Sequence, residues 1–120
     1  MGANLINLIR FAHIMRLYHN PRCSKSRQAL ALLQDSGVKF EEYRYLKEGI
    51  DTVDMSTLFA VQGIIRTSDL NPEDNFDASK FSEFKLLLES RPEVLQRPVL
   101  IHNGQAVIGR PPEDILILLP

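Results

Sequence analysis

The sequence predicts a single α/β domain with a mixed β-sheet. Three observations support this class: a length of 120 residues, an alternation of strand and helix patterns, and an Asn-Gly pair between two short apolar runs near the C-terminus. A chain of this length buries a hydrophobic core but divides poorly into two domains. We therefore expect one domain over residues 1–120.

The first half of the chain follows a strand, helix, strand order. RLYH (16–19) is a short strand candidate, and a helical pattern runs from Ser24 to Ser36. Its apolar face is formed by Ala29, Leu30, Leu32 and Leu33. Gly37 should end this helix, because the left-handed backbone costs glycine no side-chain clash. VKFEEYRYL (38–46) alternates well enough to predict a second strand.

An inserted helical region is expected at about residues 47–91. One helix should run from Asp51, as the capping residue, to about Val61. Another should begin at Ser79 and end before Pro92. The apolar face of this second helix is predicted to hold Phe81, Phe84 and Leu88.

The C-terminal part predicts a hairpin and a helix. PVLIH (98–102) and QAVI (105–108) are strands joined by Asn-Gly. PPEDILILL (111–119) should be helical, with prolines and acidic residues at its start. Its apolar face would hold Ile115, Leu116, Leu118 and Leu119. A parallel β-α-β unit followed by a hairpin and a helix is the layout of a thioredoxin-like fold with a four-stranded mixed sheet.

The first fifteen residues, MGANLINLIRFAHIM, form an apolar stretch interrupted by Asn4, Asn7 and Arg10. They make a poor signal peptide and are too short and polar to span a bilayer. Two interpretations stay open: a short helix packed on the domain, or a leader ahead of a functional start at Met15. We favour the second and treat residues 1–14 as an N-terminal extension.

Composition limits the possible partners. The formal net charge is -1, so no global field attracts nucleic acid or an acidic membrane, and we expect neither as a partner. Three histidines and one cysteine show no metal-ligand spacing, and no glycine-rich nucleotide motif is present. Any anion site must therefore be local. Nothing in the apolar pattern demands a second subunit, so we expect a monomer.

The single cysteine, Cys23, lies in YHNPRCSKSR (18–27), between a polar loop and the first predicted helix. An inert, buried cysteine is the common alternative. At a helix start, however, the dipole and unpaired N–H groups stabilise a thiolate. The neighbouring residues His19, Arg22, Lys25 and Arg27 favour the same charged form. We interpret Cys23 as a reactive thiolate.

Cys23 has no partner for an internal disulfide. In C-S-K-S, Ser26 occupies the position where a dithiol oxidoreductase would carry its resolving cysteine. A thiol from another molecule must therefore release any covalent state of Cys23. A lone, unpaired cysteine also fits a reducing compartment, so we expect a cytoplasmic protein.

The helix start that bears Cys23 is also an anion cradle, because its free N–H groups point into one small volume. Arginines bind oxyanions in a bidentate manner, and Arg66, Arg97 and Arg110 are the candidates. Each could instead be a solvated surface charge. Arg97 precedes a proline that opens a strand and Arg110 follows a strand, and sites collect at such element ends.

Three segments resemble the glutaredoxin-coupled arsenate reductase family, in its branch with a C-S-K-S motif: YHNPRCSKSR, RPVLI and IGRPPEDIL. The resemblance covers nearly all of residues 15–120. It implies a thioredoxin-like fold and an arsenate reductase domain. The segment between Leu46 and Arg66 is shorter than is usual in the family.

The resemblance also implies roles for individual residues. Cys23 corresponds to the catalytic cysteine, and Arg66, Arg97 and Arg110 correspond to an arginine triad. Arg97 and Pro98 would be joined by a cis peptide bond. The residues that would bind substrate and stabilise the thiolate are His19, Asn20, Ser24, Ser26 and Arg27. The implied reaction uses arsenate or a similar small oxyanion, glutathione as co-substrate and glutaredoxin as partner, with no bound cofactor and no metal.

A second class of function stays open. A reactive cysteine without a partner also suits a monothiol redox sensor that becomes glutathionylated, or an Spx-like regulatory or binding protein without arsenate turnover. The second cysteine of the Spx-type C-x-x-C switch is missing here. The three arginines also favour a small oxyanion.

Overall fold

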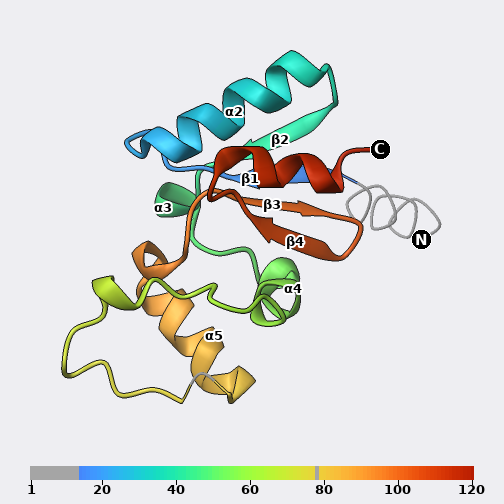
Figure 1. The fold of residues 1–120 in the computed structure, drawn as a ribbon. Coiled ribbons are helices and arrows are strands. Elements are labelled where there is room, and N and C mark those ends of the chain that lie inside the picture. Colours follow the sequence, from blue (N-terminus) through green and yellow to red (C-terminus); the bar gives the residue numbers. More distant parts are fainter. Residues whose placement is uncertain (1–13, 78) are drawn as a thin grey trace.

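The computed structural model describes residues 14–77 and 79–120, and its centre is a four-stranded mixed sheet (Figure 1). The strands are β1 (Met15–Tyr18), β2 (Phe40–Tyr43), β3 (Val99–His102) and β4 (Gln105–Ile108). Their order across the sheet is β2-β1-β3-β4. β1 and β2 are parallel, whereas β3 is antiparallel to both β1 and β4. The prediction of a mixed α/β fold is confirmed.

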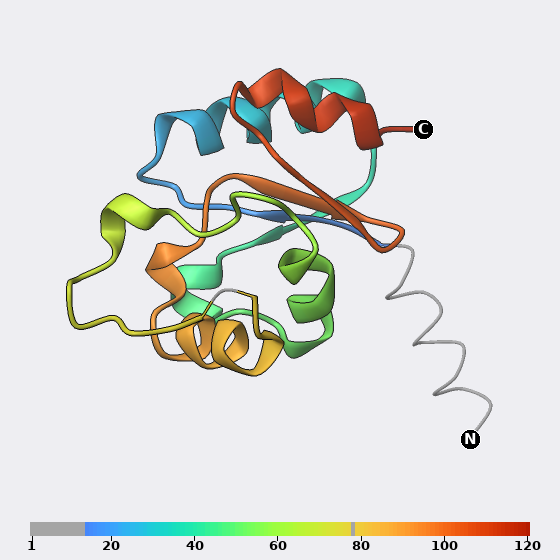
Figure 2. The ribbon, with the colours of Figure 1, turned by 60° about the horizontal axis from the view of Figure 1, so that its bottom comes forward.

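One face of the sheet is covered by α2 (Ser24–Ser36) and the 3-10 helix η4 (Pro112–Leu118), which lie side by side (Figure 2). The core on this face consists of Met15, Leu17, Ala29, Leu33, Leu100 and Ile115. The predicted stop at Gly37 is confirmed, because its φ of 76° is left-handed and its N–H donates to Gln34 O.

The other face carries a layer of short helices (Figure 2). In chain order they are α3 (Tyr45–Glu48), η1 (Thr52–Asp54), α4 (Met55–Phe59), η2 (Thr67–Asp69), α5 (Phe81–Ser90) and η3 (Pro92–Val94). They form the larger core cluster, in which Tyr45, Leu58, Phe84 and Leu88 are among the fully buried side chains. Asp51 caps η1 as predicted, by accepting from Val53 N–H at 3.1 Å.

Several predicted boundaries were wrong in this region. The second strand ends at Tyr43, because β1 offers only four residues for pairing, and the buried Tyr45 instead begins a turn of helix. The helix predicted up to Val61 is a 3-10 turn followed by α4, which ends at Phe59. The helix predicted from Ser79 begins at Phe81.

Two predicted apolar faces also need correction. Phe81 is 40% exposed and meets Phe59 edge to face, whereas Phe84 and Leu88 are buried. At the C-terminus, Leu116 is 42% exposed. The physical reason is that η4 has the 3-10 repeat of three residues per turn, so its inner face is formed by Pro112, Ile115 and Leu118.

The predicted N-terminal extension, residues 1–14, lies outside the described residues except for Ile14. In the part of the chain that the structure covers, no helix combines the length and apolar character needed to cross a membrane.

Candidate active site

The register of the sheet brings four distant segments to one edge. Tyr18, at the end of β1, pairs with Tyr43 at the end of β2 and with Val99 at the start of β3. Val99 pairs in turn with Ile108 at the end of β4. The loop to Cys23, the α3 turn, the Arg97 segment and the Arg110 segment therefore all leave the sheet at this edge.

Cys23 is the N-cap residue of α2, with an extended backbone and a half-buried side chain. Its N–H donates to Asn20 O at 3.0 Å, and its carbonyl accepts from Arg27 N–H at 3.0 Å. Burial raises the pKa of the Cys23 thiol, but the N–H groups of Ser26 and Lys25 and the side chains of Arg97 and Arg110 lower it more. The net effect is a pKa below that of a free thiol, which favours the nucleophilic thiolate.

Ser26 organises the loop that carries the cysteine. Its side chain is fully buried, and its Oγ accepts from Asn20 N–H at 2.9 Å. The same oxygen lies 2.7 Å from His19 Nδ1. Burial lowers the pKa of His19 and so favours the neutral imidazole, whose tautomer sets which group donates in this contact. The residue at the resolving-cysteine position thus fixes the loop instead of reacting.

Three other predicted residues lie around this loop. Asn20 Oδ1 accepts from Arg22 N–H at 3.0 Å, and Arg27 Nη1 donates to Pro21 O at 3.0 Å. Ser24 is the first residue of α2 and is exposed. These residues surround the cysteine, and the contacts of Asn20 and Arg27 are to the loop backbone.

Arg97 and Arg110 come together beside Cys23. Arg110 Nη1 donates to Arg97 O at 2.8 Å, and Arg97 Nη1 donates to Asp69 Oδ2 at 3.2 Å. The Arg97–Pro98 peptide bond is cis, as the resemblance implies, and Arg110–Pro111 is also cis, which the sequence did not indicate. Arg97 Nε is buried and has no hydrogen-bond partner among residues 14–77 and 79–120.

Arg66 lies next to Arg97 through a shared carboxylate. Its Nε is 3.8 Å from Asp69 Oδ2, the oxygen that also binds Arg97, and its N–H donates to Val94 O at 2.6 Å. The groups that most affect the Cys23 thiol include Arg97 and Arg110, whereas Arg66 contacts this site through Asp69.

Sequence reasoning missed Asp69 and Tyr45. Asp69 follows Arg66 by three residues, a helical spacing that could have signalled the pair. Tyr45 was assigned to a strand, but its side chain is fully buried. Burial raises the pKa of Tyr45 to about 12, and the charges that act on its hydroxyl are those of Arg97, Cys23, Arg66 and Asp69. The Tyr45 hydroxyl therefore lies within the electrostatic field of the cysteine and the arginines.

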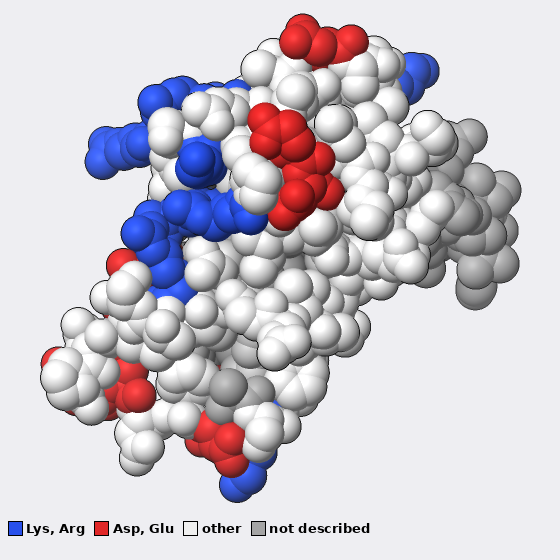
Figure 3. All heavy atoms as spheres, viewed as in Figure 1, with Lys and Arg blue, Asp and Glu red and all other residues white. Residues whose placement is uncertain are grey.

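The distribution of charged residues agrees with an anion site. Lys and Arg atoms gather on the side of the molecule where α2 begins, and Asp and Glu atoms border this group (Figure 3). The protein as a whole has a net charge of -1, so the positive region is local.

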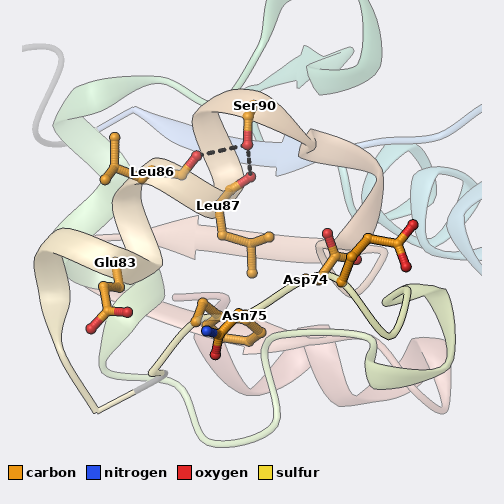
Figure 4. A pocket seen from close by; sticks show the side chains of 8 residues that line it. Asp74, Asn75, Glu83, Leu86, Leu87 and Ser90 are labelled. Carbon is orange, nitrogen blue, oxygen red and sulfur yellow. Dashed lines mark hydrogen bonds between the residues drawn. The ribbon is translucent and has the colours of Figure 1, made fainter.

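A separate pocket of about 300 Å³ lies between α5 and the segment before it (Figure 4). Its walls include Glu73, Asp74, Glu83 and Leu87, and none of the predicted site residues. Ser90 Oγ donates within α5 to the carbonyls of Leu86 and Leu87. In residues 14–77 and 79–120, no group of three or more His, Cys, Asp or Glu side chains could hold a metal ion.

The arrangement at the sheet edge combines a nucleophile with an oxyanion clamp. The first-turn N–H groups of α2 and the guanidinium groups of Arg97 and Arg110 stabilise the Cys23 thiolate. The same donors can bind the oxygens of a tetrahedral anion and spread its charge while sulfur attacks its centre.

Comparisons with known proteins show which proteins the chain is similar to. The chain is 38% identical over 111 residues to the uncharacterized protein YfgD of Escherichia coli strain K12, covering 85% of this chain and 93% of that protein. It is 35% identical over 114 residues to an arsenate reductase of Neisseria meningitidis serogroup A, covering 88% and 97%.

A solved structure and a family model extend these matches. The structure of an arsenate reductase from Vibrio cholerae superposes with a TM-score of 0.72 at 28% identity, covering 89% of this chain and 98% of that one. The fold shared with it is thioredoxin-like. The model of the ArsC family matches residues 18–118, a range that includes Cys23, Arg66, Arg97 and Arg110. The chain therefore belongs to the ArsC family.

Proposed function

We propose that the protein reduces arsenate to arsenite, with Cys23 as the nucleophile. The observation that carries this proposal is a thiol at a helix start whose pKa is lowered by the N–H groups of Ser26 and Lys25 and by the side chains of Arg97 and Arg110. Family membership supports the choice of arsenate, because relatives at 35% and 37% identity are named arsenate reductases.

In the first step, the Cys23 thiolate attacks the arsenic atom of bound arsenate. One arsenate oxygen is protonated and leaves as water, and a covalent bond forms between Cys23 Sγ and arsenic. Arg97 and Arg110 bind the remaining oxygens and stabilise the charge that develops on them. His19 is neutral and Ser26 is committed to Asn20 N–H, so both support the loop geometry.

In the second step, a glutathione thiolate attacks Cys23 Sγ. The sulfur–arsenic bond breaks, its electron pair stays on arsenic, and arsenic leaves as arsenite. Cys23 remains as a mixed disulfide with glutathione. A glutaredoxin thiolate then takes the glutathione and restores the Cys23 thiolate. The external reductants are required because the chain contains one cysteine.

The direct test is arsenite formation. Purified protein is mixed with arsenate, glutathione, glutaredoxin and a system that regenerates reduced glutathione. We expect turnover that depends on glutaredoxin and is lost in Cys23→Ser. Arg97→Lys and Arg110→Lys should each lower kcat/KM by about 10-fold or more, because lysine cannot bind two oxygens in a bidentate manner. Equal rates for wild type and Cys23→Ser would refute the proposal.

The half-exposed, unpaired thiolate also fits a second function, a monothiol sensor that is modified by glutathione. Such a protein would accumulate a stable glutathione adduct at Cys23 and form no arsenite. Mass spectrometry of the protein during the same reaction separates the two functions. The need for a reduced thiol also leads us to propose a cytoplasmic location. Because nothing in the apolar pattern of the sequence demands a second subunit, we further propose that the protein acts as a monomer.

A further inference from the structure

The buried hydroxyl of Tyr45 has no hydrogen-bond partner among the described residues. The Tyr45 side chain is 0% exposed. The two tyrosines of the sheet itself, Tyr18 in β1 and Tyr43 in β2, both have hydrogen-bonded hydroxyls. Tyr18 Oη donates to Asp54 Oδ2 at 2.6 Å, and Tyr43 Oη donates to Gly49 O at 2.7 Å. An unpaired buried hydroxyl destabilises a fold, so its retention points to a ligand.

The position of Tyr45 fits this interpretation. β2 ends at Tyr43, at the sheet edge where the Cys23 loop and the Arg97 segment also leave the sheet. The Tyr45 hydroxyl lies within the electrostatic field of Arg97, Cys23 and Arg66. Arg97 Nε is a second buried donor without a partner in the described residues. The two unpaired donors thus belong to segments that leave the sheet at the same edge.

We propose that the Tyr45 hydroxyl is a direct ligand of the tetrahedral oxyanion, donating a hydrogen bond to one of its oxygens beside Arg97. This assignment rests on the oxyanion site of the proposed function. Burial raises the pKa of Tyr45 to about 12, so the hydroxyl keeps its proton at the pH values where Cys23 is a thiolate. The Tyr45 hydroxyl is therefore a neutral hydrogen-bond donor. It forms no ion pair with the Cys23 thiolate and can donate to an oxygen of the oxyanion.

The test compares Tyr45→Phe with Tyr43→Phe, a matched variant that removes a tyrosine hydroxyl already bonded to Gly49. Arsenate, phosphate and sulfate are titrated separately against alkylation of Cys23 by iodoacetamide, and protection of the thiol gives the affinity of each anion. Alkylation without any anion, measured across pH, gives the pKa of the thiol. Thermal unfolding of the free variants reports on structure.

We expect Tyr45→Phe to weaken protection by about 10- to 100-fold, the factor for a lost hydrogen bond to a charged group. Tyr43→Phe should protect like wild type. The pKa of Cys23 should not change in Tyr45→Phe. Its melting temperature should stay equal or rise, because the substitution removes an unsatisfied polar atom. A hydroxyl with a structural role would instead lower the melting temperature.

Three results would overturn the assignment. They are unchanged protection in Tyr45→Phe, an equal loss in Tyr43→Phe, and a raised Cys23 pKa in Tyr45→Phe, which would mean that the hydroxyl serves the thiolate. Absence of protection of the wild type by all three anions would remove the oxyanion site itself. Protection of the wild type without arsenite formation would refute arsenate reduction alone and leave Tyr45 as an oxyanion ligand.

Discussion

At the scale of single residues, the acidity of Cys23 depends on groups from separate parts of the chain. The N–H groups of Lys25 and Ser26 come from the helix that follows the cysteine, whereas Arg97 and Arg110 come from the ends of the C-terminal hairpin. The thiol receives the contribution of both arginines only when these segments meet. Its reactivity is therefore a direct probe of the assembled site.

We expect the pH midpoint of Cys23 alkylation to lie below the ordinary cysteine value of 9.0. Arg110→Gln should raise the midpoint, because a positive charge that favours the thiolate is removed. Lys85→Gln on α5 is the control, since it removes one charge from an ion pair with Glu89, outside the site. A midpoint in Arg110→Gln equal to that of the control would show that the guanidinium does not stabilise the thiolate.

Gly109 allows the close approach that places Arg110. A Cβ at this position would lie 2.8 Å from Pro98 Cγ and 3.0 Å from Ile115 Cγ2. We expect Gly109→Ala to lower the free energy of unfolding by about 1–3 kcal/mol through overpacking. The shifted backbone should also displace Arg110 and raise the Cys23 pKa. Urea unfolding and iodoacetamide titration measure the two effects, and wild-type values in both would contradict the packing argument.

At the scale of elements, an ionic cluster around the buried Arg16 ties β1, β2 and η1 together. Arg16 is 7% exposed, and its Nη1 donates to Asp51 Oδ2 and to Asp54 Oδ2, both at 2.7 Å. Its Nε donates to Glu41 Oε2 at 3.0 Å, and Tyr18 Oη completes the coordination of Asp54. Because every charge in the cluster has a partner, the cost of burying these groups is offset.

Arg16→Met should destabilise the protein by about 3–5 kcal/mol, because it leaves the Asp54 carboxylate buried without its cation. Arg44→Met is the matched control. Arg44 is exposed and pairs with Glu42 at 2.8 Å, so its loss should cost less than about 1 kcal/mol. Urea denaturation of the two variants checks the difference. Similar losses would argue against a structural role for the Arg16 cluster.

The Cys23 loop should be sensitive to acid through His19. Burial lowers the folded pKa of His19 below its ordinary value of 6.5, so the unfolded state binds more protons between the two values. The stabilisation is complete above about pH 6.5 and is lost as pH falls through the folded pKa. The free energy of unfolding should therefore decline as pH falls below about 6.5. His19→Gln should flatten this decline, and an unchanged slope would contradict the assignment.

At the scale of the whole molecule, the candidate site joins both layers of the fold. α2 lies on one face of the sheet, Tyr45 and Asp69 belong to the layer on the other face, and the two arginines leave the sheet itself (Figure 2). A ligand that binds all of them should stabilise the protein against global unfolding.

Arsenate or sulfate should therefore raise the melting temperature of the wild type. Binding at 100 times the dissociation constant adds about 2.7 kcal/mol to the free energy of unfolding. Arg97→Gln should show little of this shift, whereas Lys85→Gln should retain it. Chloride at equal ionic strength controls for salt. Equal shifts in both variants would mean that the anion acts through general salt effects and not through the site.

The elements that the sequence predicted best carry strong local signals. Gly37 ends α2 with left-handed geometry, and Asn103 and Gly104, both with positive φ, form the predicted hairpin turn. The middle region was predicted less well. Its helices α3 and α4 contain four and five residues, too short for a clear periodic pattern. Their bounds depend on packing against the sheet.

The sequence alone determined the fold class and the position of Cys23 at a helix start, because helix caps, turns and apolar repeats act between residues close in the chain. The sequence also identified the arginines at the ends of strands as candidate oxyanion ligands. Only the tertiary structure decided that Arg97, Arg110 and Tyr45 are neighbours of the cysteine, and that Asp69 binds both Arg66 and Arg97. These contacts follow from strand register and from burial, which bring together residues that no local pattern connects.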